Sequence, residues 1–197
     1  MTRPTAHSIA ADLDARIYRR FRSALLDRQR TQTVILALIR AENAWAPAGL
    51  ATMIADRNRR RAWARANATL GTTWIAAKLL SRATKRPRPY FTDCPPARRK
   101  TDRESFPSTH AAVSFAAAVT VPPLLPPTPL FTLAIATTLS RLLLGEHYPS
   151  DVAAGAILGI AITTPMRLAA DPPQRSLACR RLRPRRDTQT NRPGTIG

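Results

Sequence analysis

Three short motifs between residues 85 and 151 place basic residues, histidines and acidic residues at spacings that suit chemistry on an anion. The first motif is KRPRPY at 85–90, the second is PSTH at 107–110, and the third is SRLLLGEHYPSD at 140–151. The chain has three histidines, and two of them, His110 and His147, lie inside these motifs. The combination predicts a site for a tetrahedral anion, with converging donors and a nucleophile in line with a leaving group.

The residue types fit phosphoryl transfer. Arg88 and Arg141 carry planar guanidinium groups, which match the oxygens of a phosphate. His147 and Asp151 are four residues apart, so in a helical turn the carboxylate reaches the imidazole, fixes its tautomer and stabilises the charge formed when the other nitrogen attacks phosphorus. His110 remains to protonate the departing oxygen as a general acid.

Two helix starts hold these groups. Ser108 is a good N-cap for an apolar helix, and the free backbone N–H groups after it favour an anion. Pro149-Ser150-Asp151 also has the composition of a helix start. Each residue alone has a simpler interpretation: Arg141 can extend to the membrane interface, His110 can be a satisfied polar residue at a helix end, Asp151 can be a helix cap, and 85–89 can be a solvated turn. Their joint occurrence at fixed spacings favours the site.

The elements that position the motifs are predicted to be helices. We expect helices at 9–26, 31–39, 43–55, 66–77, 108–121, 129–144 and 152–166. The proline-rich segment at 122–129 interrupts the longest uncharged stretch, so its two halves form a helical hairpin. The prediction is an all-α helical bundle of about five to six helices, largely embedded in a membrane. It divides into a basic amphipathic helix within 1–30, a membrane domain over 31–168 and a disordered arginine-rich tail over 169–197.

The N-terminal helix has an apolar stripe and a basic remainder. The stripe has a spacing of four residues and consists of Ile9, Leu13, Ile17, Phe21 and Leu25, and much of the rest is occupied by Arg16, Arg19, Arg20 and Arg22. This pattern suits a helix on an anionic membrane surface, or a surface helix packed on the protein's own core. The two cysteines, Cys94 and Cys179, show no disulfide framework or zinc spacing, and we expect no cleavable signal peptide.

The charge distribution predicts the orientation in a membrane. The chain has 31 Lys+Arg against 12 Asp+Glu, a net charge of +19, which indicates a polyanionic partner: nucleic acid, anionic lipid head groups or a phosphorylated substrate. The N-terminal segment, the turn at 56–65 and the tail from Arg167 to Arg192 fall on one side if two crossings precede that turn and four follow it. We therefore expect a multi-pass plasma-membrane protein with cytoplasmic termini bound to anionic head groups, and motifs facing the extracytoplasmic side.

The loop at 85–107 between the first two motifs would then be a basic segment on the outer side. Its positive charges include Arg98, Arg99, Lys100 and Arg103. Two interpretations stay open for it: a lid that attracts an anionic substrate, or a basic loop that is merely tolerated there.

From about Asn43 to Met166 the sequence resembles the type-2 phosphatidic acid phosphatase family, whose fold is shared with vanadium haloperoxidases and bacterial acid phosphatases. The third family motif, Ser-Arg, five residues, His, three residues, Asp, is matched in full, and the second, Pro-Ser-Gly-His, is matched with Thr109 in place of glycine. The resemblance implies that His147 forms a phosphohistidine, Asp151 orients it and His110 is the general acid. It also implies that phosphate is bound by Arg88, Ser108, Thr109 and Arg141, without a metal or another cofactor.

The first family motif, Lys, six residues, Arg-Pro, is matched only in part. Arg88-Pro89 fits, but Ser81 stands where the lysine belongs. Lys78, about one helical turn earlier, or the adjacent Arg82 supplies the missing cation, or the site has one phosphate contact fewer.

These features predict a membrane phosphatase for a lipid phosphomonoester or pyrophosphate, of the polyprenyl phosphate, phosphatidic acid or phosphatidylglycerophosphate type. Three alternatives are weighed against it: a vanadate-dependent haloperoxidase, a catalytically weakened family member and a basic nucleic-acid-binding protein. The haloperoxidase is disfavoured because those enzymes are usually soluble and much larger. The nucleic-acid partner is not expected, because the basic residues surround apolar runs and no nucleic-acid motif is present.

Overall fold

Five α-helices and one short 3-10 helix make up the described part of the chain. The computed structural model describes residues 6–26, 33, 51–52, 54–96, 104–121 and 124–170. The elements are α1 (Ala6–Leu26), η1 (Arg57–Arg59), α4 (Arg60–Thr84), α5 (Thr109–Thr120), α6 (Pro127–Leu143) and α7 (Pro149–Ala170). Within these ranges, extended pairing is limited to an isolated bridge between Pro87 and Glu104. The prediction of an all-α helical fold is confirmed.

Some predicted features lie outside the described residues. The helices expected at 31–39 and 43–55 fall largely there, as do the basic loop residues at 98–103, Cys179 and the tail beyond residue 170.

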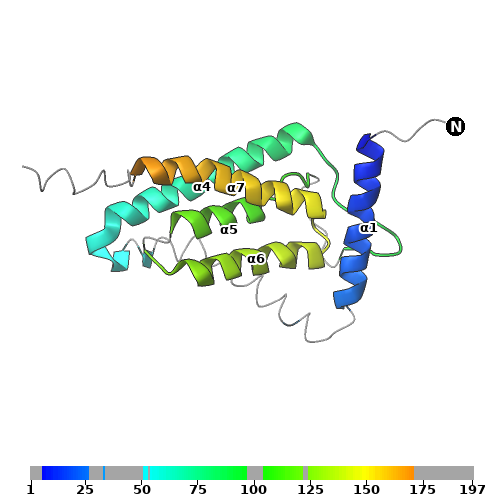
Figure 1. Ribbon diagram of the computed structural model, residues 1–197, viewed down its shortest axis with the longest axis horizontal. Coiled ribbons are helices and arrows are strands. Elements are labelled where there is room, and N and C mark those ends of the chain that lie inside the picture. Colours follow the sequence, from blue (N-terminus) through cyan, green and yellow to red (C-terminus); the bar gives the residue numbers. More distant parts are fainter. Residues whose placement is uncertain are drawn as a thin grey trace, which may run out of the picture.

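The helices α4 to α7 lie side by side along the long axis of the molecule, and α1 lies across one end of them (Figure 1). The central helix is α5, which is rich in alanine and packs against α4, α6 and α7. Contact between α5 and α7 is close because Gly155 and Gly159 have no side chains. A Cβ atom at these positions would overlap the backbone carbonyl oxygens of Ser108 and Ala112, respectively. This packing fixes the second motif relative to the third.

Two helices begin earlier than the apolar runs suggest. The run predicted at 66–77 belongs to α4, which starts at Arg60 because arginine is a good helix former and these arginines stay exposed. The helix expected to start at 129 is α6, which starts at Pro127, since proline is tolerated in the first helical turn. The predicted break between α5 and α6 is present.

The inner face of α1 is polar. Asp14, Tyr18 and Arg22 are buried, whereas Leu13 and Ile17 of the predicted apolar stripe are 57% and 45% exposed. Arg22 donates to Tyr18 Oη (2.9 Å) and to the carbonyl oxygen of Pro95 (2.6 Å). The helix therefore packs on the protein through hydrogen bonds and leaves part of its apolar stripe uncovered.

The position of α1 corrects one prediction. Ser150, at the start of α7, donates its backbone N–H to Asp14 of α1 (3.0 Å), so α1 lies at the end of the bundle that carries the motifs. The turn at 56–65 and the end of α7 lie at the other end (Figure 1). The placement of the N-terminal segment opposite the motifs was wrong, because the polar inner face of α1 finds its partners beside the motifs.

Candidate active site

The three motifs meet where α4 ends, α5 begins and α6 connects to α7. The segment after α4 runs antiparallel to the segment before α5: Ser105 N donates to the carbonyl oxygen of Arg86 (2.8 Å), and Ser105 Oγ donates to that of Pro87 (3.1 Å). Thr84 Oγ1 donates to the carbonyl oxygen of Phe106 (2.6 Å). These bonds hold the first motif against the second.

The imidazole of His147 is buried and fixed from both sides. Its Nδ1 lies 2.8 Å from the carbonyl oxygen of Ser105, and its Nε2 lies 3.3 Å from Arg88 Nη1. A carbonyl oxygen only accepts hydrogen bonds, so the Ser105 contact assigns the proton to Nδ1 and leaves the lone pair on Nε2. Nε2 therefore faces a guanidinium group, the kind of group that binds a phosphate.

Asp151 lies beside His147, as the spacing of four predicts, but its hydrogen bonds go elsewhere. Asp151 Oδ2 is 3.8 Å from His147 Nδ1 and accepts a hydrogen bond from the Tyr148 backbone N–H (2.8 Å). Asp151 Oδ1 accepts from Arg86 Nη1 (2.6 Å). The tautomer of His147 is thus set by Ser105, and Asp151 contributes a fixed negative charge close to the ring.

Arg86 joins α1 to this arrangement. Its Nη2 donates to Asp14 Oδ2 (2.7 Å), and its Nη1 donates to Ser150 Oγ (2.6 Å) as well as to Asp151. Its guanidinium carbon also lies 4.5 Å from the ring centre of Tyr148. Asp14 in turn accepts from Ser150 N (3.0 Å) and Ser150 Oγ (2.5 Å), so it caps the N-terminus of α7.

The two arginines predicted to bind phosphate converge on Glu146. Arg141 is 2% exposed and its Nη1 lies 2.9 Å from Glu146 Oε2. Arg88 Nη1 donates to the backbone carbonyl oxygen of Glu146 (2.7 Å). Glu146 therefore holds guanidinium groups from two motifs next to His147.

The second motif begins α5 as predicted. Ser108 is the N-cap, and its side chain accepts from Ala111 N, while its backbone N–H donates to the carbonyl oxygen of Asp151 (2.9 Å). Thr109 and His110 are the first two residues of α5, and both are half-buried.

The residues proposed for the missing first-motif cation lie on different faces of α4. Ser81 is on the buried face, Lys78 is half-buried and Arg82 is exposed. The structure thus brings Arg88 to the His147 ring and binds Arg141 to Glu146, the residue before His147. Among the described residues, no hydrogen bond or ion pair joins the Arg82 side chain to the motifs.

Burial lowers the pKa of His147 below its ordinary value, and the positive charge of Arg88 acts in the same direction. Asp151 and the Ser105 carbonyl oppose this shift without cancelling it. For Arg86, burial works to lower the pKa, but the hydrogen bond to Asp14 and the charge of Asp151 outweigh it and raise the pKa. The site therefore favours a neutral imidazole beside permanently charged guanidinium groups.

Four contributing residues were not selected from the sequence: Asp14, Arg86, Ser105 and Glu146. Arg86 and Glu146 lie inside the motifs, and an acidic residue directly before His147 was a usable signal. Ser105 acts on His147 through its backbone carbonyl, which no side-chain pattern reveals. Asp14 lies 72 residues before its partner Arg86, so its role depends on the tertiary structure.

The chain is similar in sequence to phosphatases from mycobacteria. The decaprenylphosphoryl-5-phosphoribose phosphatase of Mycobacterium tuberculosis is 38% identical over 134 residues, which cover 60% of this chain and 67% of that protein. The phosphatase of the same name from Mycolicibacterium smegmatis is 35% identical over 119 residues, which cover 56% of this chain and 62% of that protein.

Two solved structures share the fold. The transmembrane PAP2-type phosphatidylglycerolphosphate phosphatase of Bacillus subtilis superposes with a TM-score of 0.71 at 22% identity, covering 85% of this chain and 89% of that one. Aquifex aeolicus LpxE superposes with a TM-score of 0.60 at 19% identity, covering 80% of this chain and 95% of that one.

The sequence model of the PAP2 superfamily matches residues 62–171, the range that contains all three motifs. This match covers more than half of the chain, and it agrees with the relatives and with the fold. The chain therefore belongs to the PAP2 superfamily, as its three motifs predict.

Proposed function

We propose that this protein is a membrane-embedded phosphatase that hydrolyses a lipid phosphate through a phosphohistidine formed on His147. The observation that carries the proposal is the position of the His147 ring. Its Nδ1 is bound to the Ser105 carbonyl oxygen at 2.8 Å, and its Nε2 faces Arg88 at 3.3 Å. A neutral imidazole with a fixed tautomer, turned toward a phosphate-binding cation, is arranged for nucleophilic attack on phosphorus.

In the first step, His147 Nε2 forms a bond to phosphorus while the bond between phosphorus and the lipid oxygen breaks. His110 donates a proton to that oxygen, so the lipid leaves as an alcohol, or as a phosphate if the substrate is a pyrophosphate. In the second step, water attacks phosphorus, the N–P bond breaks and inorganic phosphate leaves. His110 takes the proton of the attacking water, and the enzyme returns to its starting state.

The phosphate oxygens are bound by Arg88 and Arg141 and by the start of α5. Ser108 and Thr109 provide hydroxyl groups there. The first backbone N–H groups of α5 form the positive end of the helix dipole, which favours the phosphate. Glu146 positions Arg141, and Asp151 stabilises the positive charge on the phosphorylated imidazole. Of the two first-motif candidates, the half-buried Lys78 fits a phosphate contact better than the exposed Arg82.

For the substrate, we favour a phosphomonoester on a polyprenyl-linked carrier among the three lipid classes considered. The support is the sequence similarity to two phosphatases named for decaprenylphosphoryl-5-phosphoribose. Phosphatidic acid and phosphatidylglycerophosphate are the alternatives that a substrate panel separates.

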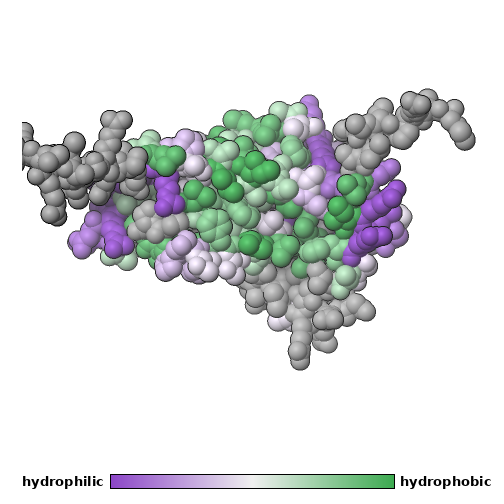
Figure 2. Space-filling model, viewed as in Figure 1, coloured by the Kyte–Doolittle hydropathy of each residue, from purple (hydrophilic) through white to green (hydrophobic). Residues whose placement is uncertain are grey.

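The surface supports membrane embedding. On the face shown in Figure 2, apolar side chains cover the middle of the bundle and hydrophilic ones gather toward both ends. Within the bundle, large apolar residues are exposed on α4, α6 and α7, among them Trp74, Leu79, Ile135, Leu139, Ile157 and Ile160. Of the described helices, one is both long and apolar enough to cross a bilayer, at Pro149–Ala169 with a mean hydropathy of 1.5.

We place the motif end on the extracytoplasmic side of the plasma membrane. The turn at 56–65 and the end of α7 share the opposite end, where their arginines meet the positive-inside tendency and anionic head groups. On the motif side, α1 exposes Leu13 and Ile17 together with arginines, which suits a helix lying at the membrane interface.

The experiment is a phosphate-release panel on detergent-solubilised protein, with polyprenyl-linked, glycerolipid and soluble phosphates, each with and without EDTA. We expect release from lipid substrates that EDTA does not change. His147→Asn should lower it about a thousandfold or more, since asparagine can donate to Ser105 in place of Nδ1 but has no nucleophilic nitrogen. Release that persists in His147→Asn, or that EDTA abolishes, would overturn the mechanism.

A second arm tests the role of His110. His110→Ala should slow release from alkyl phosphates far more than from p-nitrophenyl phosphate, whose leaving group needs no proton. Equal losses on the two substrates would exclude His110 as the general acid.

A further inference from the structure

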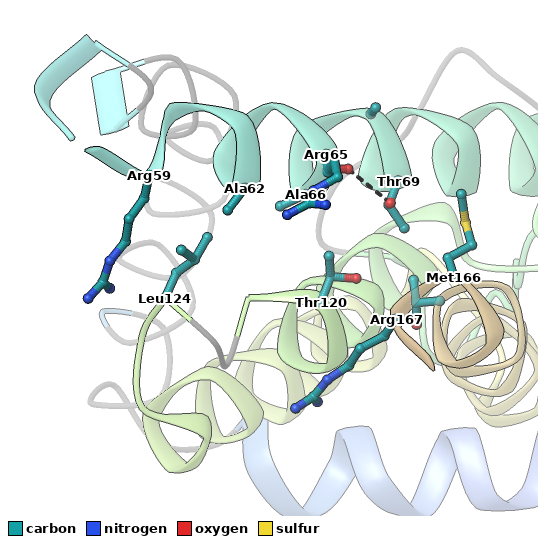
Figure 3. Close-up of a pocket in the computed structure, with 11 residues that line it drawn as sticks. Arg59, Ala62, Arg65, Ala66, Thr69, Thr120, Leu124, Met166 and Arg167 are labelled. Carbon is teal, nitrogen blue, oxygen red and sulfur yellow. Dashed lines mark hydrogen bonds between the residues drawn. The ribbon is translucent and has the colours of Figure 1, made fainter. Parts of the chain in front are cut away.

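A pocket of about 440 Å³ opens at the end of the bundle opposite the motifs, between α4 and α7 (Figure 3). It exists because the central helix is short. At a rise of about 1.5 Å per residue, the 12 residues of α5 span roughly 18 Å, whereas the 25 residues of α4 span roughly 37 Å. Thr120 ends α5 and lies at the pocket wall, while α4 and α7 continue on either side.

The charged residues that line this pocket are all arginines. Arg59 and Arg65 line it from the start of α4, and Arg167 lines it from the end of α7. In Figure 3, Arg59 and Arg167 lie at its rim and come from different ends of the lining helices. None of the three forms an ion pair within the described part of the chain, and the pocket lining contains no carboxylate. Three guanidinium groups on one pocket favour an anionic ligand.

The helix ends leave this preference to the arginines. At the start of α4, Asp56 accepts from Arg59 N (3.1 Å), so its carboxylate offsets the positive end of that helix dipole. The C-terminus of α5 would by itself repel an anion, but Arg167 Nη1 donates to the carbonyl oxygen of Val119 (3.0 Å) and offsets that effect.

The rest of the lining is mostly apolar. It consists of Ala62, Ala66, Ala68, Leu124 and Met166 with the hydroxyl-bearing Thr69, Thr120 and Thr163. Thr120 Oγ1 is buried and makes no hydrogen bond within the described residues, so it can donate to a ligand oxygen. A small soluble anion would contact the arginines and leave the apolar wall unused, whereas an amphipathic anion contacts both.

We propose that this pocket binds the head group of an anionic glycerophospholipid. The lipid phosphate lies between the guanidinium groups of Arg59, Arg65 and Arg167, and the glycerol and first acyl methylenes lie against Ala62, Leu124 and Met166. The bound lipid would fill the space between α4 and α7 beyond the C-terminus of α5, and so connect the three helices. This inference rests on the proposed membrane embedding and does not depend on the proposed hydrolysis.

The test measures lipid binding without turnover. Detergent-solubilised protein is titrated with phosphatidylglycerol or phosphatidylcholine of identical acyl chains, and bound lipid is counted by native mass spectrometry. The pocket variant is Arg59→Gln/Arg65→Gln/Arg167→Gln. The control is Arg57→Gln/Arg60→Gln/Arg61→Gln, which removes the same charge from exposed arginines at the same end that do not line the pocket.

We expect wild type and control to prefer phosphatidylglycerol, and the pocket variant to bind it about tenfold or more weakly. A photo-crosslinkable phosphatidylglycerol should label peptides from 59–69 and 163–167. Equal losses in both variants, equal binding of phosphatidylcholine, or displacement by inorganic phosphate alone would overturn the proposal. Crosslinks only at 84–90 or 105–110 would also overturn it, since they would place the lipid in the active site. Extraction of the protein from membranes without detergent would instead refute the embedding itself.

Discussion

The guanidinium group of Arg86 lies 2.6 Å from the carboxylate of Asp151, and its other terminal nitrogen is bound to α1. The first helix lies outside the range that matches the PAP2 superfamily, 62–171, yet its Asp14 contacts both Arg86 and the first turn of α7. Through these bonds the position of Asp151 beside His147 depends on α1. Outer partners of a site commonly act in this way, by orienting the groups that meet the substrate.

Asp14→Asn tests this dependence. Asparagine retains an acceptor for Ser150 N but removes the negative charge that faces Arg86. The side chain of Arg86 is 28% exposed, so water screens part of this interaction. We expect kcat to fall about tenfold with little change in KM, because the variant disturbs the positioning of Asp151 and leaves the phosphate contacts in place. The free energy of unfolding should fall by about 1–3 kcal/mol, the partial exposure keeping it below the loss for a fully buried pair.

Asp12→Asn is the matched control, since Asp12 is an exposed carboxylate on the same helix. It should leave kcat and the thermal unfolding temperature unchanged. Equal effects of the two variants would mean that α1 acts only through its general charge.

The pH dependence follows from the lowered pKa of His147. In the proposed mechanism only the neutral imidazole attacks phosphorus, so kcat/KM should fall on the acid side as His147 gains a proton, with a midpoint below the ordinary value of 6.5. Arg88 contributes to the lowering, so Arg88→Gln should move this midpoint to higher pH. It should also reduce the maximal rate about tenfold to a hundredfold through the lost phosphate contact.

Arg82→Gln serves as the control for Arg88→Gln, because it removes an exposed arginine near the same end of α4. Its acid limb should coincide with that of the wild type on the same substrate. An acid midpoint that stays fixed in Arg88→Gln would show that another group titrates there.

Glu146→Gln tests how Arg141 is held. The pair is buried, with Arg141 2% and Glu146 1% exposed, so removing the carboxylate leaves a guanidinium charge without its buried counter-ion. We expect a loss of about 3–5 kcal/mol in the free energy of unfolding. Saturating concentrations of vanadate or phosphate, which supply a counter-ion, should restore part of the thermal stability. No rescue by either anion would indicate that Arg141 does not face the phosphate site.

The local parts of the site were predictable because their signals are local. The spacing of four between His147 and Asp151, the N-cap at Ser108 and the start of α7 at Pro149 are all present. The partners of these residues were not predictable. Asp151 was expected to bind His147, but Arg86 and the Tyr148 backbone take its hydrogen bonds, and the carbonyl of Ser105 holds the imidazole. Such choices depend on how two connections pack, which residue spacing does not encode.

For the fold, too, local features were predictable from the sequence and long-range contacts were not. Hydrophobic periodicity and proline positions located the helices, with starts shifted where arginines or prolines extend them. For α1 the periodicity gave the correct helix but not the face that packs on the protein: Leu13 and Ile17 are exposed, whereas Asp14 and Arg22 are buried. A helix normally buries its apolar stripe, and here buried hydrogen bonds to residues far along the chain decide the outcome.

The close packing of α5 on α7 yields the last prediction, on Gly159. A Cβ there would overlap the carbonyl oxygen of Ala112, which is backbone in a helix and cannot move aside cheaply. Gly159→Ala should therefore separate the two helices and lower the free energy of unfolding by about 1–3 kcal/mol. Gly71→Ala is the control, because nothing lies within 4 Å of the new methyl group on the exposed side of α4, and alanine in a helix interior should be neutral or stabilise by up to about 1 kcal/mol. Thermal unfolding in detergent compares the two. Since α5 and α7 carry the second and third motifs, Gly159→Ala should also lower kcat/KM, and Gly71→Ala should not. Equal stability of the two variants would mean that the helices have room that the structure does not show.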